Sequence, residues 1–202
     1  MSELADVARQ RTAIHEGAHL SIGIAMQLPI GVTSIRGTPG YLGICGLRGT
    51  LRTRGYDAAR PLVLQPARPR RNLEALVRFV LAGPASDALW FPPQGSGYVR
   101  TPRWLEEPPA LPPVAQGELK RLEESGALAD DPARADEDAA LELAYLLVGH
   151  KLAAAYYAWA MADTRAMVAD QARGIERLAE ELLAHGAVAP HAARAVYRRR
   201  TP

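Results

Sequence analysis

The sequence predicts a mainly helical α+β domain with a small antiparallel sheet. Residues 3–27 form a proline-free stretch whose apolar residues recur at helical spacing. A glycine-rich segment follows that is typical of a β-hairpin, and most of the remaining chain divides into helical stretches. At 202 residues the chain is long enough for one domain with a sizeable core, and we expect a single domain over residues 1–202.

The first helix carries apolar side chains at the spacing of one helix face: Leu4, Val7, Ile14, Ala18 and Ile22. No proline interrupts it before Pro29. Gly17 is its weak point, because glycine inside a helix costs about 1 kcal/mol relative to alanine. We therefore expect another part of the chain to pack closely against the helix at Gly17.

Residues 15–19 of this helix read His-Glu-Gly-Ala-His. On a helix, His15 and His19 lie one turn apart on the same face, so both imidazoles can reach one metal ion while Glu16 flanks it. Zinc bound by two imidazoles and a third protein ligand keeps a fourth position for water and lowers the pKa of that water. Glu16 would then accept the proton. The alternative is that the three residues share an ordinary amphipathic helix by chance.

Glycines recur every third residue from Gly37 to Gly49. Five repeats with a single proline cannot sustain a collagen triple helix. We expect a hairpin instead, in which residues 32–36 pair with residues 41–47, with small residues that let another backbone come close. The alternative is a flexible turn without a role.

The rest of the chain alternates irregular and helical segments. Residues 52–72 and 92–117 are rich in arginine and proline and are expected to lack regular structure. Further helices are expected at about 73–90, 118–126, 136–162, 164–185 and 189–198, and Gly186 is a natural helix stop.

The order of these blocks resembles the peptidase domain of FtsH-type AAA proteases, a zincin with a His-Glu-Ala-Gly-His helix followed by a strand and a glycine-rich turn. The matching pieces are Ala13-Ile14-His15-Glu16, Val32-Thr33-Ser34-Ile35-Arg36-Gly37 and Gly40-Tyr41-Leu42-Gly43. Residues 77–89 resemble the family's Leu-Ala-Gly-Arg-Ala-Ala-Glu-Glu helix, and residues 175–196 resemble its closing helices. The order Gly17-Ala18 between the histidines departs from the family, as does Ala135-Asp136 before the helix that supplies its third zinc ligand.

The resemblance implies that Asp136 is the third zinc ligand, because Ala140 and Ala144 follow it in the family's register. An aspartate where a helix begins is more often an N-cap or a partner of the helix dipole. The substitutes as third ligand are Asp138, Glu142 and, ranked last, His150.

Composition excludes several other classes. With 24 basic and 22 acidic residues, the charge is nearly balanced and predicts no nucleic-acid partner. The single cysteine, Cys45, rules out an internal disulfide. We expect no signal peptide and no membrane span, and therefore a cytoplasmic protein. No Gly-x-x-x-x-Gly-Lys loop is present, so the ATPase module of the FtsH-type proteins is not expected here.

These features together predict a zinc-dependent endopeptidase in which His15, His19 and Asp136 hold the metal and Glu16 activates water. Its substrates would be unfolded or flexible polypeptides, held by strand addition along residues 31–36. It would act without ATP, with a homo-oligomer or a separate unfoldase as its expected partners. The alternatives are a catalytically inactive zinc-binding module that serves as a regulatory or assembly subunit, and another zincin such as a phage-repressor-cleaving peptidase.

Overall fold

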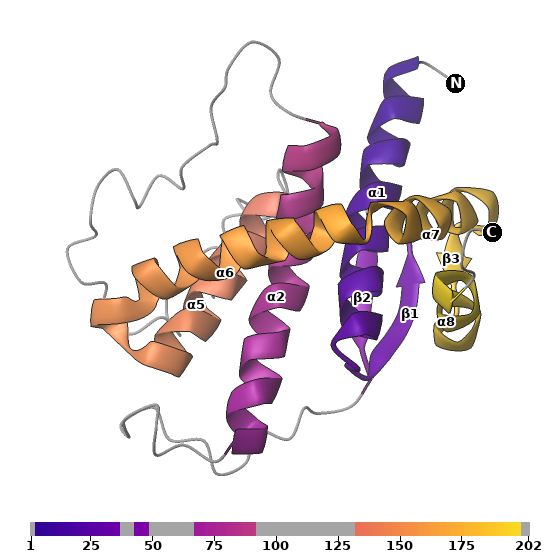
Figure 1. Cartoon of the computed structure of the whole chain (residues 1–202). Coiled ribbons are helices and arrows are strands. Elements are labelled where there is room, and N and C mark those ends of the chain that lie inside the picture. The colour runs from indigo at the N-terminus through magenta and orange to yellow at the C-terminus, as the bar shows by residue number, and fades with distance from the viewer. Residues whose placement is uncertain (1–2, 37–42, 49–66, 92–131, 199–202) are drawn as a thin grey trace.

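The computed structural model describes residues 3–36, 43–48, 67–91 and 132–198. The chain folds into a mainly helical α+β structure with a small antiparallel sheet, as the sequence predicts (Figure 1). The elements follow one another as α1 (Glu3–Ala25), β1 (Ile30–Ser34), β2 (Ile44–Leu47), α2 (Ala67–Trp90), α5 (Pro132–Val148), α6 (His150–Asp170), α7 (Ala172–His185), β3 (Ala187–Val188) and α8 (Pro190–Arg198).

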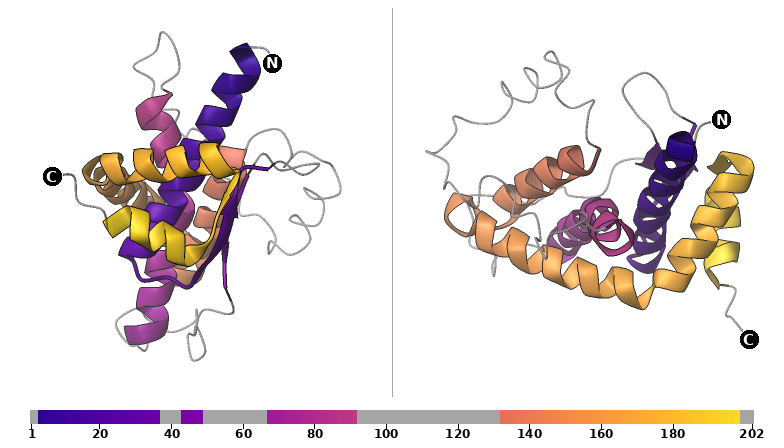
Figure 2. Two further views of the ribbon diagram at one scale, coloured as in Figure 1. Left: turned by 90° about the vertical axis from the view of Figure 1, so that its right-hand side faces the viewer. Right: turned by 90° about the horizontal axis from the view of Figure 1, so that it is seen from above.

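Helix α1 lies at the centre of the described structure, packed between α2 and α7 (Figures 1 and 2). On one side, Ala18 and Ile22 join a core built with α2, α5 and α6. On the other side, Ala13 and Leu20 join a second core built with the sheet, α7 and α8. A helix that is buried on two sides holds its polar side chains in place by packing, and this is where the His-Glu-Gly-Ala-His segment lies.

The close packing expected at Gly17 is present. A Cβ at this position would lie 3.1 Å from the carbonyl oxygen of Ile175 and 3.4 Å from the backbone nitrogen of Ala179, both on α7. The glycine therefore lets α7 approach the backbone of α1 one residue after Glu16. The helix-propensity cost of Gly17 is offset by this contact between the two helices.

The sheet has the strand order β2-β1-β3 with antiparallel pairing throughout. The expected hairpin is formed by Ile30–Ser34 and Ile44–Leu47, with Thr33 opposite Cys45. The two-residue strand β3 pairs with the other side of β1 at Thr33 and Ser34. Strand β1 is thus central in the described sheet. The expected strand addition along residues 31–36 conflicts with this, because Thr33 and Ser34 already pair with β3 and the N–H of Ile35 donates to the carbonyl oxygen of Gly186.

Several helix boundaries differ from the prediction. Helix α2 begins at Ala67, so residues 67–72 are helical although they belong to the proline- and arginine-rich segment 52–72. The helix expected at 136–162 ends at Val148, because Gly149 adopts a φ of 74° that a regular helix does not allow. The break expected near residue 163 lies at Gln171. Segment 92–117 and the helix expected at 118–126 lie outside the described residues.

The C-terminal part agrees more closely with the prediction. Gly186 ends α7 in the left-handed conformation, with a φ of 74°, and its N–H donates to the carbonyl oxygen of Leu182. The chain then passes through β3 into α8.

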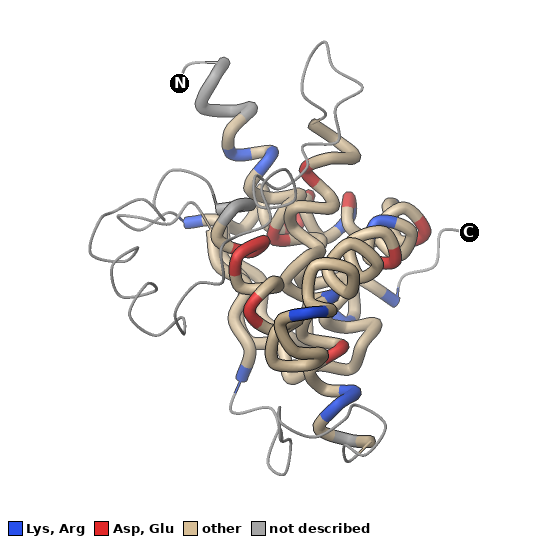
Figure 3. Tube along the Cα trace, turned by 90° about the vertical axis from the view of Figure 1, so that its left-hand side faces the viewer, with Lys and Arg blue, Asp and Glu red and all other residues tan. Residues whose placement is uncertain are grey.

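Basic and acidic residues are interspersed along the described chain (Figure 3). Among the described helices, no stretch has both the length and the apolar character that crossing a membrane requires.

Candidate metal centre

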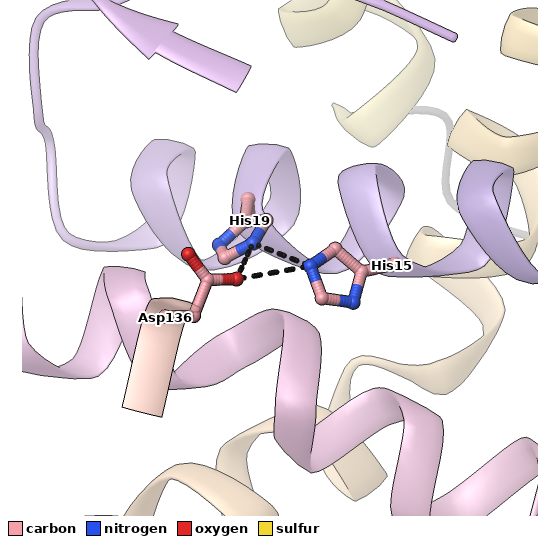
Figure 4. A group of neighbouring side chains, drawn as sticks. All are labelled: His15, His19 and Asp136. Carbon is pink, nitrogen blue, oxygen red and sulfur yellow. Dashed lines mark hydrogen bonds and ion pairs between the residues drawn. The ribbon is translucent and has the colours of Figure 1, made fainter. Parts of the chain in front are cut away.

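Three side chains from two distant parts of the chain converge in the interior. His15 and His19 come from α1 and Asp136 comes from α5 (Figure 4). The Nε2 atoms of the two imidazoles lie 3.1 Å apart, and Oδ2 of Asp136 lies 3.0 Å from each. The side chains of His15 and His19 are 5% and 7% exposed and that of Asp136 is 27% exposed, so the group is largely buried and reaches solvent at Asp136.

Hydrogen bonds at the other ring nitrogens determine which way the imidazoles face. Nδ1–H of His19 donates to the carbonyl oxygen of Phe79 at 2.7 Å, and a carbonyl oxygen can only accept. Nδ1–H of His15 donates to the carboxylate of Asp87 at 3.3 Å. The Nε2 atom of each neutral ring is therefore an acceptor, and both point at a carboxylate oxygen, which is also an acceptor.

The pKa values reflect this crowding of acceptors. Burial alone would lower the pKa of His15, but Asp136 and Asp87 outweigh it and raise that pKa to about 10. The pKa of His19 is also raised, because Asp136 outweighs the effect of burial. Burial would raise the pKa of Asp136, but the two imidazoles lower it to about 2. The three groups together thus stabilise a positive charge held between them.

A single metal ion could contact all three atoms at once, whereas one proton can bridge only two of them. Ligand atoms about 2.0 Å from a tetrahedral zinc ion lie about 3.3 Å from one another. The observed separations of 3.0–3.1 Å are close to that value. The buried group of His15, His19 and Asp136 could therefore hold a metal ion.

Asp136 is the carboxylate that the structure brings to the histidines, as the sequence-based assignment expected. Helix α5 starts at Pro132, so Asp136 lies in its second turn and is not the N-cap. Ala140 and Ala144 are fully buried on the same face, which directs Asp136 inward.

The substitutes considered for the third ligand do not join this group. Asp138 and Glu142 lie on α5 but outside the cluster. His150 is exposed at the start of α6, where its ring stacks on Tyr145 with ring centroids 4.7 Å apart. The helix break at Gly149 separates His150 from the helix that carries Asp136.

Asp87 on α2 is a functional candidate without an assigned role in the sequence-based prediction. Its side chain is 9% exposed, and besides the imidazole of His15 it binds the guanidinium of Arg11 at 2.9 Å. Burial would raise the pKa of Asp87, but His15 and Arg11 lower it, so the group is a carboxylate. A carboxylate behind a coordinating histidine fixes the ring orientation and raises its basicity. The signal in the sequence was the single acidic residue within the block at 77–89.

Glu16 lies beside the cluster without belonging to it. It is 5% exposed, and its Oε2 has no hydrogen-bond partner among the described residues. Burial raises its pKa, opposed by His19 and His15. Gly43, the residue before β2, packs against it: a Cβ there would lie 2.7 Å from Oε1 of Glu16. The strand therefore begins directly over the Glu16 carboxyl group.

No protein-family model matches this chain, and no curated protein matches it significantly. The resemblance to the FtsH-type peptidase domain accordingly stays a prediction from the sequence blocks. Any assignment of function depends on the geometry of the metal centre.

Proposed function

We propose that this chain is a zinc-dependent endopeptidase that hydrolyses unfolded or flexible polypeptides. The observation that carries the proposal is the convergence of three acceptor atoms, from His15, His19 and Asp136, within 3.1 Å of one another. Two imidazoles and one carboxylate are a donor set of catalytic zinc sites, which leave a fourth position open, whereas structural sites use four protein ligands. Within the described residues, no fourth side chain belongs to the cluster.

Glu16 is the proposed general base. Zinc at this centre would supply Lewis acidity, which lowers the pKa of water and polarises a peptide carbonyl. Burial raises the pKa of the Glu16 carboxyl group above its ordinary value, which favours proton uptake by this side chain. Oε2 of Glu16 has no hydrogen-bond partner among the described residues, so it can accept a hydrogen bond from a reactant. Glu16 follows His15 directly on α1, so its side chain belongs to the same helix turn as the first proposed ligand.

Strand β2 is the proposed docking edge for the substrate, in place of residues 31–36. In the described part of the chain, β2 pairs with β1 on one side and with no strand on the other. Its first residues follow Gly43, which packs on Glu16. An extended peptide that pairs with this edge would be held mainly by backbone hydrogen bonds. Such binding suits flexible substrates of varied sequence and requires no ATP.

The test is Glu16→Gln, which keeps the shape of the side chain and removes the base. The variant should bind zinc as the wild type does and lose cleavage of casein by on the order of a hundredfold or more. Glu142→Gln, on α5 but outside the cluster, is the matched control and should keep both properties. Addition of ATP should not change the rate of casein cleavage by the wild type or by Glu142→Gln.

Each outcome has a distinct meaning. Wild-type protein without metal after reconstitution with zinc would refute the proposal. Zinc binding without cleavage across a broad panel of unstructured peptides would favour the inactive zinc-binding module. Equal cleavage by wild type and Glu16→Gln would place the base elsewhere.

A further inference from the structure

One face of α2 lies against the metal centre through three residues spaced four apart. The carbonyl oxygen of Phe79 accepts from His19, and the carboxylate of Asp87 accepts from His15. Gly83 lies midway between them on the same helix face. The two hydrogen bonds therefore hold the imidazoles against the helix at the point where Gly83 has no side chain.

A side chain at Gly83 would overlap the coordinating atoms. An ideal Cβ would lie 2.5 Å from Nε2 of His19 and would also overlap Nε2 and Cε1 of His15. Real Cβ atoms essentially never come within 3.0 Å of such neighbours. Even one methyl group would therefore have to displace the imidazoles or push α2 away from α1.

The imidazoles have little freedom to move aside. His15 is 4% exposed and His19 is 5% exposed, and each is held at Nδ1 by a group on α2. A rotation that relieved the overlap at Nε2 would break these hydrogen bonds. It would also move Nε2 away from Oδ2 of Asp136.

We propose that Gly83 is a positioning residue of the metal centre: its missing side chain lets α2 close on α1 so that both Nε2 atoms converge with Asp136. The consequence for metal binding rests on the proposed function. The steric part does not, because the overlap involves only protein atoms.

A rival explanation is that glycine is needed because proline follows it. Pro84 lies inside α2, and a residue before proline is strained in the helical conformation by its own Cβ and N–H. The two explanations differ in which substitution rescues Gly83→Ala. Removal of the imidazoles should rescue it if the metal-centre overlap matters, and Pro84→Ala should rescue it if proline matters.

The experiment is a mutant cycle on the metal-free protein, in chelator, followed by urea denaturation. Gly83→Ala should lower the denaturation midpoint in the wild-type background. In the His15→Ala/His19→Ala background it should leave the midpoint unchanged or raise it, because alanine favours helix. An equal loss in both backgrounds, or rescue by Pro84→Ala alone, would overturn the proposal. If Gly83→Ala does not fold, recovery of folding in the histidine-free background supports the proposal, and failure to recover refutes it.

Zinc affinity provides the second readout. Gly83→Ala should weaken zinc binding by roughly 100-fold, the upper end of the range for changes to residues that support metal ligands. Gly174→Ala is the matched control on α7, because its Cβ would make only ordinary contacts at 3.7–3.8 Å, and it should bind zinc normally. Equal zinc affinity of Gly83→Ala and wild type would refute this proposal and leave the proposed function intact. Absence of zinc from wild type would refute the function, while the metal-free cycle would still decide the role of Gly83.

Discussion

Replacement of Asp87 by alanine tests whether the carboxylate behind His15 supports metal binding. In the structure, Asp87 accepts from Nδ1–H of His15 and holds the guanidinium of Arg11. Without it, the imidazole can rotate, and the tautomer with Nε2 free to coordinate is no longer favoured. His19 should be unaffected, because its Nδ1 partner is the backbone carbonyl of Phe79.

The expected magnitude follows from the geometry. Loss of a partner behind a coordinating histidine costs about 10-fold to 100-fold in metal affinity. The His15–Asp87 distance of 3.3 Å lies just beyond the usual range for N–H···O bonds, which indicates a weak bond. We therefore expect the lower end, a loss of about tenfold, or about 1.4 kcal/mol of binding free energy.

The assay is competition for zinc with a chromophoric chelator at constant pH. Glu74→Ala is the matched control, because Glu74 is an acid on the same helix that pairs with Arg70 and lies outside the metal cluster. It should bind zinc as the wild type does. Undiminished affinity in Asp87→Ala would refute the role assigned to the carboxylate. An equal loss in Glu74→Ala would show that the effect comes from the stability of α2 as a whole.

Three further predictions follow from the same geometry. Asp136→Ala should abolish stoichiometric zinc binding, measured by elemental analysis, whereas Asp138→Ala should retain it; the reverse result would contradict the ligand assignment. Zinc competes with a proton on His15, whose pKa is raised to about 10 in the metal-free protein. Apparent affinity should therefore rise about tenfold per pH unit between pH 7 and 9, with release of about one proton measured by calorimetry in buffers of different ionisation enthalpy. A flat pH profile would exclude a protonated metal-free centre. Gly17→Val should destabilise the protein by about 1–3 kcal/mol, because its side chain meets the backbone of Ile175 on α7, and urea denaturation that shows no loss would contradict this close approach.

Much of the candidate site was predictable because its information is local. Two histidines four residues apart share a helix face wherever that helix lies, so His15, His19 and Glu16 followed from the helical period. The choice of Asp136 came instead from the resemblance to the FtsH-type domain, and Ala140 and Ala144, which follow it in that register, are fully buried in the structure. The helix stop at Gly186 and the close contact at Gly17 followed from glycine chemistry.

The tertiary structure decided which groups meet around those residues. Asp136 lies 121 positions after His15, and only the packing of α5 and α1 against α2 brings their side chains together. The carbonyl of Phe79 is part of the backbone and has no signal in the residue pattern, although it orients His19. The two-residue strand β3 is too short to show a period, yet its pairing makes β1 central and leaves β2 as the edge. Short segments and backbone groups gain their roles from neighbours that are distant along the chain, so a reading of residue types and spacing cannot assign those roles.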